Sequence, residues 1–368
     1  MNTKINLGLS DETKDLALQA FEKIKNANSI LLHFHPSPDP DSTGSALGLS
    51  MAILNAFPNK KVTVIKGDSD IPSGFSHMPG MESVLMKSYK DLVLGGEISN
   101  YDLFIACDSG SVGMISSDIG AEEKFPKGMF VIVIDHHHTN TRYGNINIVD
   151  SSYPAACTLI ADLLTFLNIE ITPDVARNLF LGTFTDTGGF RYGGVDKNSV
   201  TKALNVATRL STITPLMFED INIMENSNSK DSLAFEALAL SSIQEIPFSI
   251  KNNLSKSLSG EKYIGAFSPI SNEMIKSKGI NMKNVSSHGV PNKIKSVIGY
   301  NIGATLIEEE VGVIKISMRS RDAEKFDVSK VALALGGGGH KAAAGAKLKM
   351  GFEDAKKMFV DTVQKLFV

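Results

Sequence analysis

The chain has 368 residues, of which 42% are hydrophobic and 21% charged, and its formal net charge at pH 7 is −3. The length predicts two domains, and the composition is that of a globular protein with a sizeable core. The lack of a large basic excess argues against tight non-specific binding of long duplex nucleic acid. It leaves room for a small anionic ligand held by a few local cations or metal ions.

The amino-terminal segment predicts an amphipathic helix and not a targeting signal. Ser10 is followed by Asp11 and Glu12, which is typical of a capped helix start, and no basic segment precedes a long apolar run. The sequence contains no run of about 18 apolar residues, so it predicts no membrane span. Cys107 and Cys157 belong to no CxxC motif, so we expect buried thiols of a reducing compartment, with a disulfide as the alternative. We therefore expect a cytoplasmic protein that does not bind membranes.

In the first half of the chain, strand-like and helix-like segments alternate. The apolar runs at 101–108 and 129–135 are nearly continuous, which is typical of strands buried on both faces of a parallel sheet. The alternation predicts a doubly wound α/β domain. The expected strands are 29–35, 60–67, 101–108 and 129–135, and the expected helices are 43–57, 155–168 and 173–184.

The second half predicts a separate, smaller domain. Residues 197–245 have a mostly helical pattern with polar patches, and strand-like segments return after about residue 260, before a final amphipathic helix at 352–368. We expect one domain at 1–200, a helical linker with the start of the second domain at 201–255, and a smaller α/β domain at 256–368.

Histidine and aspartate side chains gather where the predicted strands end. Because parallel strands end at one edge of their sheet, we expect several of these groups to meet in one crevice. Five of the eight histidines lie in two short segments of this kind, and both segments also carry acids. The residues are His35, Asp39 and Asp41 after the first strand, Asp108 after the third, Asp135, His136 and His137 after the fourth, and Asp186 after a helix.

Taken singly, these residues have simpler interpretations. A lone aspartate at a strand end, such as Asp108, more often caps a helix or forms a turn, and a lone histidine such as His33 is more often structural. Together, however, four carboxylates and two imidazoles need a compensating cation, since the carboxylates repel one another. Oxygen-rich ligands with some imidazole favour Mn²⁺ or Mg²⁺, and six side chains suit two ions about 3.5–4 Å apart better than one.

The stretches around these residues resemble the motifs of the DHH phosphoesterase family. HPSPDPDSTGS at 35–45 resembles the first motif, and IDHHHTN at 134–140 contains the Asp-His-His triplet after which the family is named. ACDSG at 106–110 and GTFTDTGGFRY at 182–192 are similar to the second and fourth motifs. KISMRSR at 315–321 and GGGGHKAAAG at 336–345 resemble the attached DHHA1 domain. The motifs occur in order along almost the whole chain, which argues against chance.

The resemblance implies a two-metal site with two catalytic residues beside it. Asp135 would orient the site, and His137 would lie against the scissile phosphate, where it stabilises charge or protonates the leaving oxygen. The implied ligands are His35 and Asp39 for one ion, Asp41 and His136 for the other, and Asp108 and Asp186 as bridges.

The resemblance also implies substrate contacts. Glycine lets backbone N–H groups approach an anion or a base edge closely, although a four-glycine run is equally well explained as a flexible turn. Arg319 offers a fork to a phosphate, although a single arginine is most often a surface residue. The implied substrate-binding residues are Arg319, Ser320, Gly337, Gly338, Gly339 and His340 in the second domain, and Asn140 and Arg191 in the first.

The motifs are most similar to those of stand-alone DHH/DHHA1 proteins, the oligoribonucleases (nano-RNases) that also hydrolyse 3′-phosphoadenosine 5′-phosphate and share a core with RecJ. This implies a phosphohydrolase with two Mn²⁺ ions, Mg²⁺ being the alternative, and an active site in the cleft between the domains. Short single-stranded RNA or DNA and nucleotides are the expected partners, and a homodimer is an expected option. The alternatives are a cyclic-dinucleotide phosphodiesterase, a pyrophosphatase and a catalytically inactive nucleotide-binding module. His138 and Thr139 depart from the family pattern, in which a proline often follows the triplet.

Overall fold

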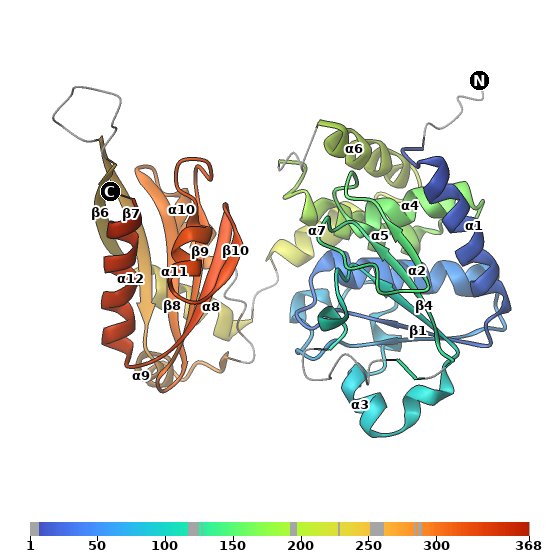
Figure 1. Ribbon diagram of the computed structural model, residues 1–368, viewed down its shortest axis with the longest axis horizontal. Helices are drawn as coiled ribbons and strands as arrows, with labels where there is room; N and C mark the ends of the chain where they lie inside the picture. The colour runs from blue at the N-terminus through green and yellow to red at the C-terminus, as the bar shows by residue number, and fades with distance from the viewer. Residues whose placement is uncertain are drawn as a thin grey trace. The chain divides into compact units, whose positions relative to one another are not determined.

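The computed structural model describes residues 7–116, 125–126, 128–191, 197–226, 229–250, 261–282, 285 and 289–367. The chain forms two compact units, Met1–Ser227 and Asn228–Val368 (Figure 1). Each unit has its own sheet and its own buried core. The domain boundaries expected at residues 200 and 255 stay predictions.

The first unit is built on five parallel strands in the order β2-β1-β3-β4-β5, which confirms the predicted doubly wound parallel sheet. β1 pairs with β2 on one side and β3 on the other, so the strand order reverses between β1 and β3. Sheets of this kind bind ligands beyond the carboxyl ends of the strands at such a reversal. The strands are β1 (Ser29–His33), β2 (Lys61–Ile65), β3 (Leu103–Cys107), β4 (Phe130–Asp135) and the edge strand β5 (Ile146–Val149), which was not predicted.

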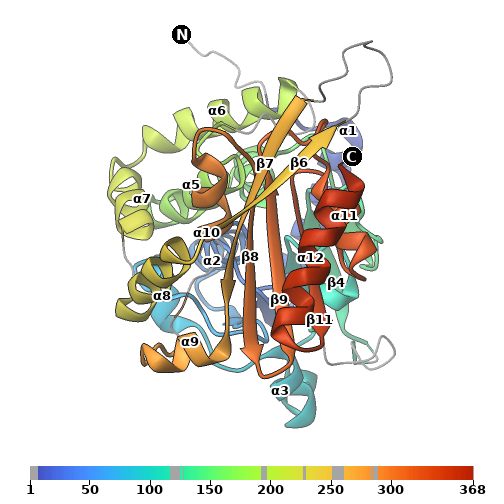
Figure 2. The same cartoon turned by 90° about the vertical axis from the view of Figure 1, so that its left-hand side faces the viewer.

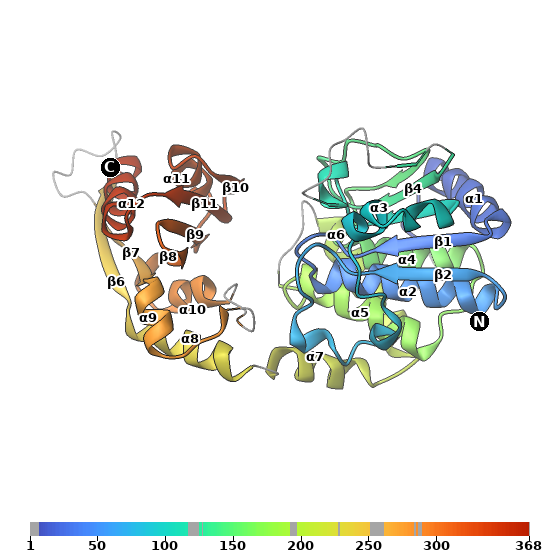
Figure 3. The same ribbon diagram turned by 90° about the horizontal axis from the view of Figure 1, so that it is seen from below.

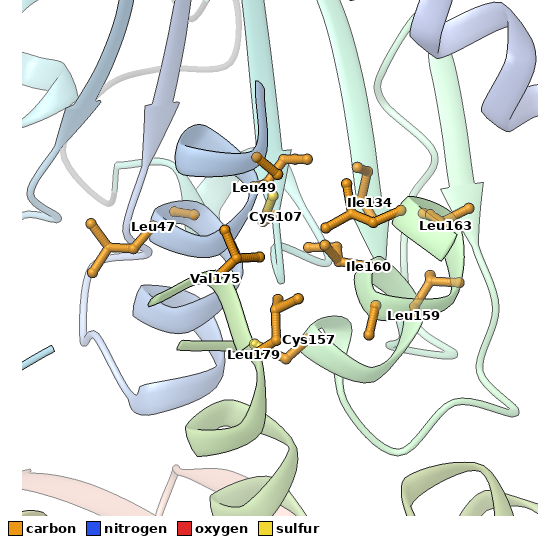
Figure 4. Packing of buried hydrophobic residues seen from close by; sticks show 14 of the residues in the cluster. Leu47, Leu49, Cys107, Ile134, Cys157, Leu159, Ile160, Leu163, Val175 and Leu179 are labelled. Carbon is orange, nitrogen blue, oxygen red and sulfur yellow. The ribbon is translucent and has the colours of Figure 1, made fainter. Parts of the chain in front are cut away.

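Alternate residues of each strand pack on opposite faces of this sheet. Ile30 of β1 belongs to the core on one face, and Leu31 belongs to the core on the other. In Figure 4, Cys107 of β3 and Cys157 of a helix lie among leucine and isoleucine side chains; both are buried free thiols, as expected. The first face is covered by α1 (Asp11–Asn26), α2 (Pro40–Ala56), α4 (Ala156–Phe166) and α5 (Pro173–Asp186), and the second by α3 (Tyr89–Leu94).

The start of α2 differs from the expectation. The helix begins at Pro40, not at Thr43. Pro40 fits the first helical turn because its missing N–H would have no partner there, and Asp39 caps the helix by accepting a hydrogen bond from Ser42 N. Asp41 therefore lies in the first turn of α2, which runs beside α5 (Figure 3).

The helical pattern expected at 197–245 forms three helices: α6 (Lys197–Ser211), α7 (Met217–Asn226) and α8 (Lys230–Ser241). α7 is joined to α5 by Arg177, whose guanidinium donates two hydrogen bonds of 2.7 Å to the Asp220 carboxylate. The structure thus assigns α7 to the first unit and α8 to the second.

At the amino end, α1 begins behind Ser10, whose hydroxyl accepts a hydrogen bond from Thr13 N, so the predicted cap is confirmed. Within the part of the chain that the structure describes, no helix is both long and apolar enough to cross a membrane.

The second unit contains a six-stranded mixed sheet in the order β10-β11-β9-β8-β7-β6, in which only β7 and β8 pair in parallel. This confirms a second α/β unit. Helices α11 and α12 pack on one face, where Leu306 of β8 points, and α8 and α10 pack on the other with Ile307 (Figure 2). The elements are β6 (Gln244–Ile250), β7 (Glu261–Ile270), α9 (Asn272–Ser277), α10 (Val290–Ser296), β8 (Tyr300–Glu310), β9 (Val313–Ser320), α11 (Val328–Ala334), β10 (Gly338–His340), β11 (Ala343–Lys349) and α12 (Phe352–Leu366).

Candidate metal centre and substrate-binding face

Carboxylates and imidazoles meet at the carboxyl edge of the first unit's sheet. Strands β1, β3 and β4 end there next to one another, and the first turn of α2 and the last residue of α5 reach the same place. The structure therefore brings together the eight residues that the sequence singled out, while their individual roles stay predictions. Three groups have ligand-type atoms within 4.8 Å of one another: His35, Asp39 and Asp108; Asp41, His136 and Asp186; and Asp108, Asp135, His136 and His137.

Asp108 divides its carboxylate oxygens between two histidines. Its Oδ2 lies 3.5 Å from Nε2 of His35, and its Oδ1 lies 3.4 Å from Nε2 of His136. The Asp108 side chain is only 3% exposed, and Oδ1 accepts no hydrogen bond from the described residues. A carboxylate in this position can bridge two cations.

Asp39 and His35 face each other beside the first turn of α2. Oδ2 of Asp39 lies 3.5 Å from Nε2 of His35, whereas its Oδ1 accepts the capping hydrogen bond from Ser42 N at 2.9 Å. The Ser42 hydroxyl in turn accepts a hydrogen bond of 2.9 Å from the His35 backbone N–H. The start of α2 thus fixes the backbone of the histidine and leaves one oxygen of Asp39 for a ligand.

Asp41 is buried against the amino end of α4. Its carboxylate accepts hydrogen bonds from Ala156 N at 2.7 Å and Cys157 N at 2.9 Å. Burial, followed by the negative charge of Asp108, raises the pKa of Asp41 to about 7. Its Oδ2 lies 3.7 Å from Nε2 of His136. The two backbone N–H donors at the start of α4 fix this carboxylate beside His136.

The donor set fits divalent cations. Burial lowers the pKa of His136, but the carboxylates of Asp108, Asp41 and Asp186 overcome this and raise it to about 10. The crowded carboxylates therefore favour a positive charge at this place. The separations of 3.4–3.7 Å around His136 are longer than hydrogen bonds. They suit ligand atoms that share an ion: two atoms that are each about 2.1 Å from an ion lie about 3.0 Å apart at an angle of about 90° and about 3.6 Å apart at about 120°.

Asp135 orients His137. Its buried carboxylate lies with Oδ1 2.8 Å from Nδ1 of His137, and its Oδ2 accepts a hydrogen bond of 2.6 Å from the Asn140 amide. The hydrogen bond to Asp135 raises the pKa of His137. Because a carboxylate can only accept, Nδ1 carries the proton and Nε2 is left for another partner. The His137 side chain is 43% exposed, so a substrate can reach it.

Sequence reasoning identified Asn140 but did not single out Ser109 and Tyr143, which form hydrogen bonds next to Asp108. Ser109 O accepts hydrogen bonds from the Tyr143 hydroxyl at 3.0 Å and the Asn140 amide at 3.3 Å, and Ser109 Oγ lies 3.3 Å from Nε2 of His33. Burial lowers the pKa of His33 to about 3, so the imidazole is uncharged. Ser109 lies in the ACDSG motif, which was a usable signal, but nothing local pointed to Tyr143, which is 34 residues further along the chain.

The turn after α5 carries Arg191. Gly188 and Phe190 have positive φ values of 58° and 62°, and the Phe190 ring packs edge-on against Phe184 with ring centroids 5.7 Å apart. Arg191 is exposed, and its Nε donates a hydrogen bond of 2.5 Å to Gly188 O. Among the described residues, Arg191 forms no hydrogen bond or ion pair with the ligand groups.

In the second unit, the strand register aligns Arg319 and His340 in one row across the sheet. Arg319 of β9 pairs with Ala343 of β11, which pairs with His340 of β10, and Gly303 of β8 pairs with Arg319 on its other side. Directly opposed residues point to the same face, so Arg319 and His340 share one face. Next to Arg319, the buried Ser320 hydroxyl has no hydrogen-bond partner among the described residues.

Lys295 adds positive charge near Arg319, and sequence reasoning did not identify it. A Cβ at Gly303 would lie 2.5 Å from Lys295 N, so α10 runs directly against this part of β8. Burial, followed by the charges of Arg319 and Arg321, lowers the pKa of Lys295. The sequence signal that could have found it is the stretch 280–295, which contains no acidic residue.

Packing explains two glycines of the run before His340. A Cβ at Gly337 would lie 2.1 Å from Gly345 O, and Gly339 has a φ of 137°, so neither position accepts a side chain without strain. A Cβ at Gly338 would meet nothing within 4 Å, and this residue is exposed on the edge strand β10. A ligand can therefore approach the backbone of Gly338.

Comparison with known proteins agrees with this geometry. Residues 29–183 match the DHH family, N-terminal domain, and residues 269–368 match the DHHA1 domain. A bifunctional oligoribonuclease and PAP phosphatase NrnA of Thermus thermophilus is 30% identical over 320 residues, which are 87% of this chain and 84% of that protein. A probable bifunctional oligoribonuclease and PAP phosphatase NrnA of Streptococcus mutans is 27% identical over 328 residues, 88% of this chain and 91% of that protein.

A solved structure has a similar fold over nearly the full length. The exopolyphosphatase-related protein from Bacteroides fragilis superposes with a TM-score of 0.75 at 23% identity, covering 96% of each chain. The domain matches fall in both units, and the Thermus thermophilus relative is similar over most of its length. The chain therefore belongs to the DHH family of phosphoesterases, in the group that carries a DHHA1 domain.

Proposed function

We propose that this chain hydrolyses short oligoribonucleotides and 3′-phosphoadenosine 5′-phosphate (PAP). The names of its relatives carry both activities, oligoribonuclease and PAP phosphatase. The observation that supports the proposal most is the position of Asp108, whose two oxygens face His35 and His136. A shared carboxylate between two sets of ligands is the arrangement of two-ion sites that cleave phosphate esters.

Two divalent ions would be held around Asp108, and we propose Mn²⁺ because the donors combine carboxylates with imidazole. When bound, such ions stabilise negative charge on a phosphoryl group and lower the pKa of water. The proposed ligands are His35 and Asp39 for one ion, Asp41 and His136 for the other, and Asp108 and Asp186 for both.

His137 is the proposed proton donor. Its Nδ1 proton is held by Asp135, which fixes the ring and directs Nε2 to the substrate side. From Nε2, the imidazole protonates or hydrogen-bonds the oxygen that leaves the phosphate. The Asn140 amide is already engaged by Asp135 and Ser109, so we propose that Asn140 positions these groups and does not contact the substrate.

The proposed role of the second unit is to bind the nucleotide or terminal phosphate of the substrate. Arg319 and His340 share a face, and Gly338 leaves its backbone open beside them. A guanidinium fork suits a phosphate, and glycine N–H groups suit an anion or a base edge. Ser320 and Arg191 are proposed as further contacts. The net charge of −3 favours short substrates, because long strands need an extended basic surface.

A substrate panel tests the proposal. The protein is stripped of metal with EDTA, supplied with Mn²⁺ or Mg²⁺, and assayed with di- to pentanucleotide RNA, PAP, linear and cyclic dinucleotides, and pyrophosphate. We expect mononucleotides from the RNA and phosphate from PAP, and no turnover without an added ion.

The other outcomes assign the other functions. Turnover restricted to cyclic dinucleotides indicates a cyclic-dinucleotide phosphodiesterase, and turnover restricted to pyrophosphate indicates a pyrophosphatase. Nucleotide binding without any turnover indicates an inactive binding module. A homodimer and a cytoplasmic location stay predictions; the native mass in solution tests the first, and cell fractionation tests the second.

A further inference from the structure

The backbone at Asp108 is in a left-handed conformation. Its φ is +51°, a region that is sterically disfavoured for residues with a Cβ. Of the four non-glycine residues with positive φ in the described part of the chain, Asp108 alone is buried. Such a conformation persists only where the surroundings enforce it, so the residues around Asp108 need to be identified.

Both the hydroxyl and the backbone carbonyl of Ser109 have polar contacts. Its hydroxyl lies 3.0 Å from Cys107 O and 3.3 Å from Nε2 of His33. Its carbonyl oxygen accepts hydrogen bonds from the Tyr143 hydroxyl and the Asn140 amide. The Asp108 N–H continues the strand ladder by donating to Ile134 O at 3.0 Å. The left-handed residue is therefore fixed at its N–H and through the residue that follows it.

His33 is a rigid neighbour of Ser109. Its side chain is buried, and its ring stacks on Phe104 with centroids 5.2 Å apart. Nδ1 lies 2.9 Å from Phe34 O, which can only accept, so Nδ1 carries the proton and Nε2 is an acceptor. Nε2 lies 3.3 Å from the Ser109 hydroxyl, whose one proton goes either to Nε2 or to Cys107 O at 3.0 Å. This geometry excludes rotation of the imidazole away from Ser109 without loss of both contacts.

Asn140 links this arrangement to the proposed proton donor. One amide nitrogen, Nδ2, reaches both Ser109 O and Oδ2 of Asp135, and Asp135 in turn binds Nδ1 of His137. A displacement of the peptide after Asp108 would therefore also displace the carboxylate that orients His137.

We propose that Ser109 is a positioning residue. Held by His33, Asn140 and Tyr143, it fixes the left-handed backbone of Asp108, aims one carboxylate oxygen at each set of ligands, and couples Asp108 to Asp135. The inference rests on the proposed function only in that Asp108 is taken as a shared metal ligand.

Two tyrosines provide a matched test. Tyr143→Phe removes the hydroxyl that donates to Ser109 O, whereas Tyr89→Phe removes a buried hydroxyl that has no hydrogen-bond partner among the described residues. Both tyrosines contact Phe125 in the same hydrophobic cluster, so the two variants change the packing alike. The readout is the Kd for Mn²⁺ of the metal-stripped full-length protein, measured by calorimetry, together with the thermal midpoint.

We expect Tyr143→Phe to weaken Mn²⁺ binding by about 10-fold and Tyr89→Phe to leave it unchanged, since groups behind metal ligands typically change affinity 10- to 100-fold. Ser109→Ala and His33→Phe, which remove the hydroxyl side of the arrangement, should each weaken binding by about 10- to 100-fold. In Tyr143→Phe, Ser109→Ala and His33→Phe, kcat should fall while KM stays within about twofold, because these substitutions leave the proposed substrate-binding residues untouched.

Each result decides the question. Wild-type Mn²⁺ affinity in folded Tyr143→Phe and Ser109→Ala overturns the inference, and so does a lower thermal midpoint without a change in affinity, which is the signature of a merely structural role. If Ser109→Ala does not fold, the tyrosine pair still decides. A wild-type protein that binds no Mn²⁺ also overturns the inference. A wild-type protein that binds Mn²⁺ but hydrolyses no substrate refutes the proposed function alone, and the affinities still test Ser109.

Discussion

Three acids of the candidate metal centre in the first unit are held differently from His340 on the Arg319–His340 face of the second. The side chains of Asp41, Asp108 and Asp135 are 1%, 3% and 0% exposed. Hydrogen bonds from a backbone N–H and from a side-chain amide fix the carboxylates of Asp41 and Asp135, respectively. His340, in contrast, is exposed on a short edge strand. Buried, cross-braced groups suit chemistry, which needs fixed geometry, whereas exposed groups can adjust to a ligand. Substitutions in the first unit should therefore act on kcat, and substitutions on the second unit's face should act on KM.

The largest expected effect is that of Asp108→Asn. The substitution keeps the shape of the side chain but removes the charge shared between His35 and His136, so turnover should fall below detection. Elemental analysis after dialysis should show bound Mn²⁺ falling from about two ions per chain to about one or fewer. Circular dichroism controls for folding. Full activity in this variant would contradict the bridging role and remove one side of the comparison.

The next effect is that of His137→Gln. Loss of a positioned proton donor should lower kcat by about 10²- to 10⁴-fold while the Mn²⁺ content stays the same. His138→Gln is the matched control, because His138 is the exposed neighbour outside the three ligand groups. Equal losses in both variants would indicate a general effect of the loop, and an unchanged kcat in His137→Gln would rule out the proposed role.

Arg319→Ala should have a smaller effect, and it should change KM and not kcat. Removing a charge-assisted contact worth about 1.5–3 kcal/mol should raise KM for short RNA by about 10- to 100-fold with little change in kcat. Lys347→Ala is the control, since Lys347 lies on neighbouring β11 and pairs with Glu309 at the surface. A fall in kcat as large as the rise in KM would break the proposed division between the two regions.

The smallest expected effects concern the glycine run. Gly337→Ala should lower the free energy of unfolding of the second unit by about 1–3 kcal/mol, because the new methyl would collide with Gly345 O. Gly338→Ala should leave stability unchanged, since its Cβ would lie in open space. Thermal unfolding of both variants measures the difference, and Mn²⁺ binding should be unaffected in each. A rise in KM for Gly338→Ala alone would sharpen the comparison by placing the ligand against this backbone.

Local patterns predicted β1 to β4 and missed β5 and β6. β3 and β4 were predicted because a continuous apolar run has few other solutions than a strand buried on both faces. β5 has four residues of alternating burial at the edge of the sheet, and β6 contains glutamine, glutamate and proline, so neither has that signature. The start of α2 was misplaced because the aspartate of a metal motif, Asp39, also serves as the helix cap.

The sequence by itself determined the class of the first unit's sheet and the edge at which its acids gather. Parallel strands end at the same side, so Asp108 and His136 had to lie at one edge of the sheet. The structure shows in addition that their strands, β3 and β4, are neighbours there. Only the tertiary structure decided how these groups are held. The bond from Ala156 N to Asp41 spans 115 residues, and that from Tyr143 to Ser109 spans 34. Such bonds depend on which surfaces the helices and loops bury. Contacts between residues that are far apart in the chain leave no local pattern in the sequence.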